Sequence, residues 1–467
     1  MIPVVTPDEM AAIDAAAPEP VEELIEQAGT ALARAALDML GGGYGRRVTV
    51  LAGKGNNGAD GRAAARRLRR RGVRVVVVDA ADEPEQLPPA HLSIDAAYGT
   101  GLRRPYVPPP PAPLLDHPDR VAPVLAADIP SGVNGLTGEL VGEPWTANQT
   151  VTFGALKPGL VLHPGAQHCG LLTVAPIGLD VSSARTHLVT AEDVSCWLPV
   201  RPAETHKWQT ACWVVAGSPG MTGAAHLAAG AAMRSGSGYV RLSTPGMEVL
   251  AGRTAPTEAV GHPLPADNWA AVIEADDQAR FRAMAVGPGL GRRPSTVESV
   301  RELAANTPLP LVIDGDGLFA LGLDAADVVA GRTAPTVLTP HDGEYRILTG
   351  EAPDPDRFAA ARSLASSTGV HVLLKGPTTV VADPGGAALA IANGDARLAT
   401  AGTGDVLAGL ICGLLSGGVE PMKAAASAAW LHGQAATSRP SGGMAASDLL
   451  LALPLAWEAA IQQGAAP

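Results

Sequence analysis

The residues that could do chemistry in the first half of this chain lie in short Gly-, Asn- and Asp-rich clusters that follow apolar runs. The clusters cover residues 56–60, 95–105 and 128–132. Asn and Ser oxygens together with a carboxylate suit a hard cation better than zinc. Asp128 follows a Val-rich run and is a candidate general acid or base. Each cluster alone could also be an ordinary turn, because Asn, Gly and Asp favour turns.

The second half contains a Gly-rich segment that suits phosphate chemistry. Residues 400–405 read TAGTGD and precede an apolar run at residues 406–411. Small residues let a backbone approach phosphate closely, and a helix N-terminus stabilises its charge. Asp405 could take a proton from an attacking hydroxyl, or it could simply favour the helix dipole. No Walker A pattern occurs, so the segment is not a P-loop.

Five further clusters in the second half follow expected strands in a regular order. His341 lies in one of them, where it could contact a ligand or serve only as a packing residue. In open α/β sheets, ligands bind at the carboxyl ends of the strands. The clusters cover residues 216–224, 287–291, 314–318, 339–344 and 375–379.

Alternating strand and helix patterns must position these clusters. Residues 47–52 and 73–79 read as strands that flank a loop at 54–58 and a helix at 59–71, which is a β-loop-α-β unit. The second half starts a new α/β series, so we expect an α/β protein with parallel sheets. The further expected strands are 92–96, 121–128, 149–153, 171–175, 211–217, 238–243, 283–286, 309–314, 336–338 and 370–374. The main expected helices are 21–40, 221–235, 404–415, 422–437 and 447–462.

The composition limits the classes to which the chain can belong. Of 467 residues, 46% are hydrophobic but only 3% are aromatic, so Ala, Val and Leu must fill the core. The net charge of −12 argues against a nucleic-acid-binding surface. The four cysteines are far apart, which argues against a zinc site and a disulfide framework. We expect neither a membrane span nor a signal peptide, and therefore a cytoplasmic protein.

Taken together, the clusters of the first half resemble the NAD(P)HX epimerases over residues 1–185. The motifs that carry the resemblance are NNGxD at 56–60, DxxxGTGL at 95–102, DIPSG at 128–132 and TFGALKPG at 152–159. The resemblance implies a Rossmann-like fold and epimerisation at C6 of hydrated NADH or NADPH.

The same resemblance implies roles for individual residues. Asp128 would bind substrate and move the proton, and a potassium ion would be held by Asn57, Asp95 and Ser131. Lys157 lies close to these motifs, and a role for it is our hypothesis. The implied substrate contacts are Asn56, Asn57, Gly58, Ala59, Asp60, Gly99, Thr100, Gly101, Leu102, Arg103, Arg104, Pro105 and Asp128.

Residues 190–467 resemble the ribokinase-like ADP-dependent NAD(P)HX dehydratases. The resemblance implies that ADP or ATP phosphorylates the S-form hydrate and that loss of phosphate regenerates NADH or NADPH, leaving AMP when ADP is used. Asp405 would be the base, and Mg²⁺ is expected with the nucleotide, with Asp316 and Glu344 as neighbours. The implied hydrate contacts are Ala224, Gly289, His341 and Asp405, and the implied nucleotide contacts are Lys375, Gly376, Pro377, Thr378, Thr379 and Gly404.

Three departures from the family patterns are visible. Ala59 stands where a second Gly is usual, which would weaken substrate binding if that position needs positive φ and would cost nothing if a helix begins there. Asp342 stands where Pro is common, and Gly315 and Gly317 stand where Ala is common. We expect these last changes to loosen turns without removing chemical groups.

Both resemblances occur in the order of the fused bifunctional NAD(P)HX repair enzymes, with domains expected over 1–190 and 191–467. Two alternatives stay open: the second half could be a small-molecule kinase that releases a stable phosphoester, and the first half a non-catalytic binding module. We expect a homo-oligomer whose partners are the small molecules NADHX, NADPHX and ADP, with no nucleic acid and no membrane among them.

Overall fold

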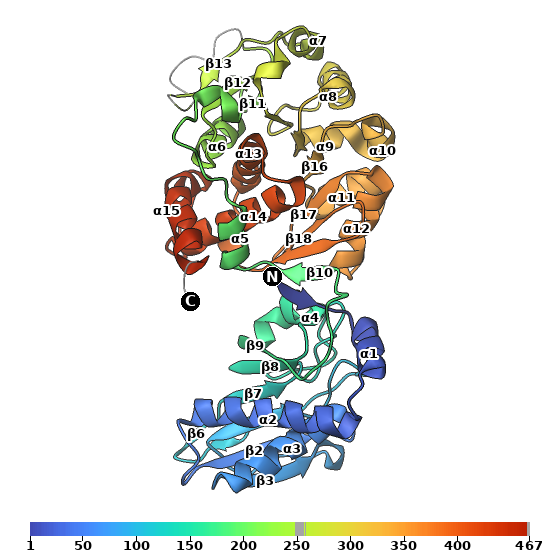
Figure 1. Ribbon diagram of the computed structural model, residues 1–467, viewed down its shortest axis with the longest axis vertical. Helices are drawn as coiled ribbons and strands as arrows, with labels where there is room; N and C mark the ends of the chain where they lie inside the picture. The colour runs from blue at the N-terminus through green and yellow to red at the C-terminus, as the bar shows by residue number, and fades with distance from the viewer. Residues whose placement is uncertain (248–255, 257, 465–467) are drawn as a thin grey trace. The chain divides into compact units, whose positions relative to one another are not determined.

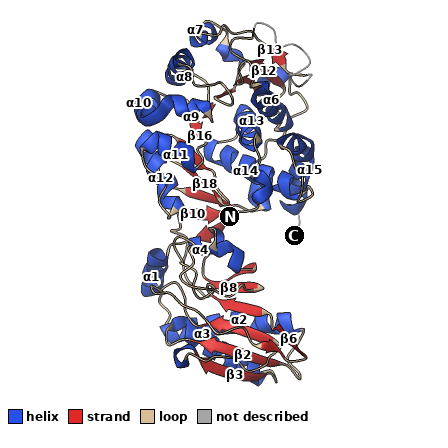
Figure 2. Cartoon of the chain, turned by 180° about the vertical axis from the view of Figure 1, so that it is seen from behind, coloured by secondary structure: helices blue, strands red, loops and turns tan. Residues whose placement is uncertain are grey.

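The computed structural model describes residues 1–247, 256 and 258–464 (Figure 1). Two compact units are present: one covers Ile2–Thr186 and the other begins at His187. Each unit is built around its own sheet, with strands and helices alternating along the chain (Figure 2). Among the described residues, no helix is both long and apolar enough to cross a lipid bilayer.

The first unit contains a parallel sheet with the strand order β3-β2-β4-β7-β8-β9. The order reverses between β2 and β4, which creates the kind of switch point at which α/β sheets bind ligands. The predicted Rossmann-like architecture is confirmed. The strands are β2 (Arg47–Ala52), β3 (Arg74–Asp79), β4 (Leu92–Ala96), β7 (Val124–Ala127), β8 (Gln149–Phe153) and β9 (Leu171–Ala175).

Helices α2 (Val21–Leu40) and α3 (Asn56–Arg70) pack against one face of this sheet. Alternate residues of β2 divide between the two faces: Val48 and Val50 join the core under the helices, and Leu51 joins a second core under the connecting loops. The remaining elements are β1 (Ile2–Val4), α1 (Pro7–Ala16), α4 (Pro158–Val161) and the hairpin β5 (Pro113–Leu114) with β6 (His117–Val121).

Two predicted element boundaries in this unit are wrong. Helix α3 begins at Asn56, so the residues predicted as the end of a loop form its first turn. Gly58 allows this start, because a Cβ there would lie 1.9 Å from the carbonyl oxygen of Gly53. Ala59 is helical and needs no positive φ. The strand predicted from residue 121 begins only at Val124, because the preceding residues pair in the β5–β6 hairpin.

The second unit contains a larger mixed sheet in the order β10-β19-β18-β17-β16-β15-β14-β11-β12-β13. Strands from β17 through β13 are parallel, and β17-β18-β19 are antiparallel. The antiparallel pair was not predicted. The strands are β10 (Thr186–Leu188), β11 (Ala211–Val215), β12 (Tyr239–Ser243), β13 (Val260–Gly261), β14 (Ala283–Val286), β15 (Leu311–Ile313), β16 (Thr336–Leu338), β17 (His371–Leu374), β18 (Thr379–Ala382) and β19 (Ala388–Ile391).

Helices cover both faces of this sheet. The helices α5, α6, α13, α14 and α15 share one Ala-rich core with the strands, and Figure 1 shows α8, α10, α11 and α12 on the other side. Their bounds are α5 (Ala191–Trp197), α6 (Thr222–Arg234), α7 (Trp269–Glu274), α8 (Pro294–Asn306), α9 (Asp316–Leu321), α10 (Ala325–Val329), α11 (Asp342–Thr349), α12 (Arg357–Thr368), α13 (Thr403–Ser416), α14 (Pro421–Thr437) and α15 (Ala446–Gly464).

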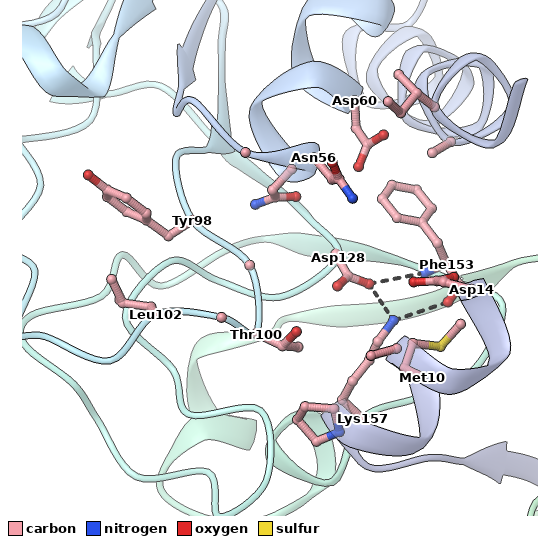
Figure 3. Close-up of a pocket in the computed structure, with 18 of the residues that line it drawn as sticks. Met10, Asp14, Asn56, Asp60, Tyr98, Thr100, Leu102, Asp128, Phe153 and Lys157 are labelled. Carbon is pink, nitrogen blue, oxygen red and sulfur yellow. Dashed lines mark hydrogen bonds and ion pairs between the residues drawn. The ribbon is translucent and has the colours of Figure 1, made fainter. Parts of the chain in front are cut away.

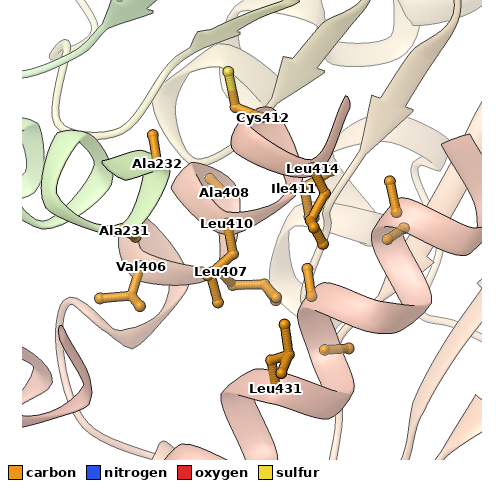
Figure 4. Packing of buried hydrophobic residues seen from close by; sticks show 14 of the residues in the cluster. Ala231, Ala232, Val406, Leu407, Ala408, Leu410, Ile411, Cys412, Leu414 and Leu431 are labelled. Atoms are coloured by element: carbon orange, nitrogen blue, oxygen red, sulfur yellow. The ribbon is translucent and has the colours of Figure 1, made fainter. Parts of the chain in front are cut away.

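Helix α13 lies in this core beside α6 (Figure 4). Glycines of α13 touch the backbone of α6. A Cβ at Gly409 would lie 2.1 Å from the carbonyl oxygen of Ala228, and one at Gly413 would lie 2.8 Å from the carbonyl oxygen of Ala232. Because the contacts advance together along both chains, the two helices run parallel. The backbone contact holds the N-terminal turn of α13, which carries Asp405, close to α6.

Candidate active sites

The first candidate site is a cavity of about 730 Å³ in the first unit. Its walls come from the carboxyl ends of β2, β4, β7 and β8 and from helices α1 and α2. Figure 3 shows that several acidic side chains face this cavity together with Lys157. The cavity therefore lies where the strand order reverses, at the edge that the sequence predicted.

Asp128 and Lys157 form a buried ion pair in this cavity. Nζ of Lys157 lies 2.5 Å from Oδ1 of Asp128 and also donates to Oγ1 of Thr152 and the carbonyl oxygen of Phe153, both at 3.0 Å. The side chain of Lys157 is 3% exposed. Asp128 itself has φ of +63°, a left-handed conformation that is rare for residues other than Gly. Lysine and backbone together hold this carboxylate toward the cavity.

Two more carboxyl groups face the same cavity. Burial, followed by the nearby charge of Asp128, raises the pKa of Asp60 to about 8, and Lys157 opposes part of this rise. Burial also raises the pKa of Asp14, a residue of α1. Asp60 is 7% exposed and has no hydrogen bond or ion pair with any described residue. The site therefore combines a compensated carboxylate with a carboxyl group that holds a proton at neutral pH.

The expected cation ligands are brought together in part. Both oxygens of Asp95 accept from Ser131, at 2.5 Å from the hydroxyl and 2.8 Å from the backbone N–H. Ser131 also contacts Tyr98, and Asn57 lies against the next residue, Gly99. Both side-chain polar atoms of Asn57 are buried without a hydrogen-bond partner in the described structure. These oxygen donors and the unpartnered amide fit a hard monovalent cation.

The predicted substrate contacts separate into two groups. Gly58, Ala59 and Pro105 are not among the residues that line the cavity. Sequence reasoning missed Met10 and Asp14 on α1, where only the helix cap was noticed. The predicted residues that do line the cavity are Asn56, Asn57, Asp60, Gly99, Thr100, Gly101, Leu102, Arg103, Arg104 and Asp128.

The second candidate site lies at the carboxyl edge of the parallel strands in the second unit. Strand register places Val215, Val286, Ile313 and Leu338 side by side at the ends of β11, β14, β15 and β16. The predicted clusters follow these residues directly. As predicted, the Gly-rich segments therefore meet along one edge of the sheet.

Asp405 is the unpaired carboxyl group at this edge. It lies in the first turn of α13 and has no hydrogen bond or ion pair within the described part of the chain. Burial, followed by the charge of Asp314, raises the pKa of Asp405 to about 7, while Lys375 opposes the shift. A carboxyl group with such a pKa can accept a proton near neutral pH.

Lys375 neutralises a neighbouring carboxylate. Its Nζ lies 2.7 Å from Oδ1 of Asp314 and 3.5 Å from Oε2 of Glu344. Burial alone would lower the pKa of Lys375, but these two carboxylates outweigh burial and raise it. A Cβ at Gly404 would lie 3.6 Å from this ammonium, so the predicted lysine and the Gly-rich loop do meet.

His341 caps helix α11 with one side of its ring. Its Nδ1 accepts from the backbone N–H groups of Gly343 and Glu344, at 2.9 and 3.2 Å. The side chain remains 58% exposed, and its Nε2 lies 3.6 Å from Oε1 of Glu344. Asp342, the departure from Pro, pairs with Arg357 at 3.0 Å. Arg357 donates in turn to the carbonyl oxygen of Lys375, so Asp342 supports the predicted nucleotide-binding turn.

The remaining predicted contacts cluster near α6 and α9. A Cβ at Gly289 would lie 2.8 Å from Cβ of Ala224, so these two predicted hydrate contacts are neighbours. Asp316, suggested as a metal neighbour, instead accepts from the backbone of Gly291 and from Nε of Arg292.

Gly315 has φ of +55°, which Ala would adopt only with strain. This departure from the family pattern therefore suits the turn.

Family models match both units. The model described as "YjeF-related protein N-terminus" matches residues 21–91 and 78–159. The model described as "NAD(P)H-hydrate dehydratase" matches residues 212–454. The two matches correspond to the two units and to the two sites described above.

Solved structures resemble the second unit. One is an ADP/ATP-dependent NAD(P)H-hydrate dehydratase from Bacillus subtilis, co-crystallised with ATP and Mg²⁺; it is 32% identical with a TM-score of 0.52, over 58% of this chain and 98% of that one. A ribokinase-like superfamily protein from Enterococcus faecalis V583 is 21% identical with a TM-score of 0.52, over 60% of this chain and 97% of that one. The second likeness supports the predicted ribokinase-like fold.

Curated relatives match nearly the whole chain. A bifunctional NAD(P)H-hydrate repair enzyme from Moorella thermoacetica is 37% identical over 465 residues, covering 88% of this chain and 87% of the relative. One from Mycobacterium tuberculosis H37Rv is 38% identical over 408 residues, covering 83% and 82%. With both sites in place at the edges of their sheets, the chain belongs to the family of bifunctional NAD(P)H-hydrate repair enzymes.

Proposed function

We propose that this protein repairs hydrated NADH and NADPH, with the first unit interconverting the R and S hydrates and the second dehydrating the S form. The observation that carries the proposal is that each unit holds a candidate acid–base carboxyl group, Asp128 or Asp405, at the carboxyl edge of its sheet, in a chain of this family. The pairing makes chemical sense, since hydration gives both epimers and one dehydratase acts on one of them.

In the first unit, the cavity receives the hydrated nicotinamide ring. Asp128 contacts the ring and moves a proton during inversion at C6, while Lys157 compensates its charge at 2.5 Å. The Gly-rich loop of residues 99–105 contacts the remainder of the nucleotide. The substrate-contact roles of Gly58, Ala59 and Pro105 are supported only by the family resemblance, because these residues lie outside the cavity wall.

In the second unit, Asp405 acts as the general base. It removes the proton from the C6 hydroxyl of the S hydrate as that oxygen attacks the terminal phosphoryl group of ADP or ATP. Ala224, Gly289 and His341 form the hydrate side of the site. Residues 375–379 and Gly404 form the nucleotide side, where Lys375 supplies the positive charge.

Two ions complete the proposal. Asn57, Asp95 and Ser131 would hold K⁺ in the first unit, and the unpartnered amide of Asn57 supports this assignment. The Bacillus subtilis relative was crystallised with ATP and Mg²⁺, which supports a nucleotide–Mg²⁺ complex at the second site. When bound, Mg²⁺ would neutralise the charge of the phosphoryl groups. Both suggested neighbours already have cationic partners in this structure, Asp316 with Arg292 and Glu344 with Lys375.

The proposal is tested by repair of a mixed substrate. Purified protein receives R and S hydrated NADH with Mg²⁺ and ADP, and recovery of the reduced-nicotinamide absorbance is followed. Wild-type protein should recover all of it, Asp405→Ala none, and Asp128→Ala only the S fraction at full rate. Release of free phosphate should match the recovered absorbance.

Two outcomes would replace this proposal. A stable phosphoester without recovery of absorbance would make the second unit a small-molecule kinase. Undiminished repair of the R form by Asp128→Ala would make the first unit a binding module. Light scattering of the same sample tests the predicted homo-oligomer.

A further inference from the structure

Asp60 is the one buried carboxyl group of the first site that the proposed function leaves without a chemical task. It lies on the second turn of α3, lines the cavity and is only 7% exposed. No described residue forms a hydrogen bond or an ion pair with it. A polar side chain so buried is normally partnered, so an unpartnered one that faces a cavity is poised for a ligand.

The surroundings of Asp60 favour its protonated form. Burial penalises a carboxylate, and the charges of Asp128 and Asp14 add to the penalty. Among the described residues, the ammonium group that acts on Asp60 is that of Lys157, and Asp128 engages it at 2.5 Å. In the view of Figure 3, the carboxyl of Asp60 and the ammonium of Lys157 lie on opposite sides of Asp128. Asp60 therefore keeps its proton, while Lys157 balances the charge of Asp128.

Inversion at C6 needs both a proton donor and a proton acceptor. Carbon C6 of the hydrate carries a hydroxyl group and is bonded to the ring nitrogen N1. Hydroxide is a poor leaving group, so the oxygen must be protonated as it departs. A carboxylate that is ion-paired with lysine carries no proton to supply, whereas a neutral carboxyl group does.

We propose that, in the direction from R to S, Asp60 is the proton donor of the epimerase site and Asp128 is the acceptor, and that the two exchange roles in the reverse direction. The C6–O bond breaks, its electron pair stays on oxygen, and that oxygen takes the proton of Asp60 and leaves as water. The lone pair of N1 forms the N1=C6 double bond. The inference rests on the proposed epimerase function.

The second half of the reaction restores the hydrate with the opposite configuration. A water molecule attacks the other face of C6, its oxygen supplies the pair for the new C6–O bond, and the N1=C6 pair returns to N1. The proton lost by the attacking water goes to Asp128. Exchange with solvent returns a proton to Asp60 and removes one from Asp128, which completes the cycle without any further reagent.

The test uses the full chain and purified R hydrate, without added nucleotide, and follows conversion to the S form by chromatography. Asp60→Asn keeps the shape of the side chain but cannot act as an acid. It should lower kcat for inversion by about 10²–10⁴-fold while KM changes only a few-fold, as expected for loss of a general acid. Asp60→Glu should retain more activity than Asp60→Asn, because the carboxyl group is kept.

Three readouts separate this role from a structural one. In water enriched in ¹⁸O, wild-type protein should place one solvent oxygen at C6 for every inversion. Dehydration of S hydrate with ADP should be unchanged in Asp60→Asn, which shows that the second unit is folded, and the nearly unchanged KM for inversion shows the same of the first unit. Asp38→Asn, the same change at an exposed position of α2, should leave inversion unchanged.

The outcomes are distinguishable. If wild-type protein does not interconvert the hydrates at all, the epimerase function itself fails. If it does so but Asp60→Asn retains its kcat, or inversion proceeds without uptake of ¹⁸O, the assignment of Asp60 is overturned. A rise in KM alone would make Asp60 a binding residue and would equally overturn the proposal.

Discussion

Each unit of this protein sets one lysine against one aspartate at its candidate site, but the two pairs differ in exposure. Lys157 contacts Asp128 at 2.5 Å and its side chain is 3% exposed, whereas Lys375 contacts Asp314 at 2.7 Å and is 19% exposed. Lys375 also faces Glu344 at 3.5 Å. Lys157 therefore pairs with one carboxylate only, whereas the side chain of Lys375 stays partly exposed and can also contact a phosphate.

Beside each pair lies a second aspartate with a raised pKa. The pKa of Asp60 is raised to about 8 and that of Asp405 to about 7, in both cases chiefly by burial. In each site, the single lysine pairs with one carboxylate and leaves a second carboxyl group without a cationic partner. Burial then raises the pKa of that second group. Asp60 lies near the ion-paired Asp128, which favours a proton donor, whereas Asp405 lies in the first turn of α13, where the helix dipole favours a carboxylate and hence a base.

The largest effect should come from removing the base of the second site. Asp405→Asn should lower the rate of dehydration of S hydrate by about 10²–10⁴-fold, since an amide cannot accept the hydroxyl proton. Absorbance recovery with saturating ADP measures it. Interconversion of R and S hydrates should be unaffected, and Asp327→Asn, an exposed change on α10, should leave dehydration intact. A dehydration rate within tenfold of wild type would show that Asp405 is not the base.

Next in size is the loss of the buried lysine of the first site. Lys157→Met leaves the half-buried carboxylate of Asp128 without its partner; breaking a fully buried pair typically costs about 3–5 kcal/mol, and the loss here should lie toward the lower end. Denaturant unfolding should show this loss for the first unit. Lys375→Met should cost more, because the Asp314 side chain that it leaves unpaired is 4% exposed, against 18% for Asp128. Equal losses in the two variants would remove the distinction drawn between the pairs.

The two activities should respond to pH in opposite directions. Dehydration needs Asp405 without its proton, so kcat/KM should fall about tenfold per pH unit below about 7. Interconversion needs Asp60 with its proton, so it should fall by a similar factor above about 8. Separate pH profiles with R hydrate and with S hydrate measure both limbs. Parallel profiles would contradict the assignment of acid and base.

The same pKa values bear on stability. Asp60 binds its proton more tightly in the folded protein than in the unfolded chain, so its contribution to stability is present at acid pH and is lost as pH rises through about 8. Asp60→Asn should flatten that decline. Thermal unfolding across this pH range provides the measurement, and an unchanged slope in the variant would argue that Asp60 is not buried as the structure shows.

Smaller effects are expected where backbones touch. Gly409→Ala would force its methyl group against the carbonyl oxygen of Ala228, at a cost of about 1–3 kcal/mol from overpacking. Gly331→Ala meets no described atom within 4 Å and serves as the matched control. Chemical denaturation compares the two. A loss in the control as large as that in Gly409→Ala would show that the helix contact is not its cause.

The smallest effect concerns the departure at Ala59. Because this residue lies inside α3, Ala59→Gly should not tighten substrate binding and should cost about 0.5–1 kcal/mol of helix stability. Both the Kd for the hydrate and the unfolding midpoint decide this. Tighter binding by the Gly variant would mean that the helix starts later in the bound protein.

Local patterns were enough to predict most elements and the edges at which the sites form. Strands such as β2, β4 and β8 have the predicted bounds; β2 and β8 are short runs rich in β-branched residues that Gly53 and Gly154 follow directly. The start of α3 was mispredicted because its opening residues, two Asn and a Gly, are typical of loops. What the helix gains there is close packing against the chain at Gly53, which no local pattern reveals.

The partners of the site residues could not be predicted in the same way. Asp128 and Lys157 are 29 residues apart in the sequence, and their contact exists only because β7 and β8 are neighbours in the sheet. Asp14 joins the cavity from a helix whose sequence shows only a cap. The pairing of Asp316 with Arg292 likewise depends on two loops that follow adjacent strands.

The glycine contact between α6 and α13 fixes how closely the two helices approach each other beside the second site. Gly409 lies one helical turn beyond Asp405, and Ala228 lies one turn beyond Ala224. Because the helices run parallel and touch backbone to backbone at that level, they cannot bring Asp405, the proposed base, closer to Ala224 on the proposed hydrate-binding wall. A single added methyl group at residue 409 would widen the distance between these two residues, so altered discrimination between substrates of different size would appear before the helices separate.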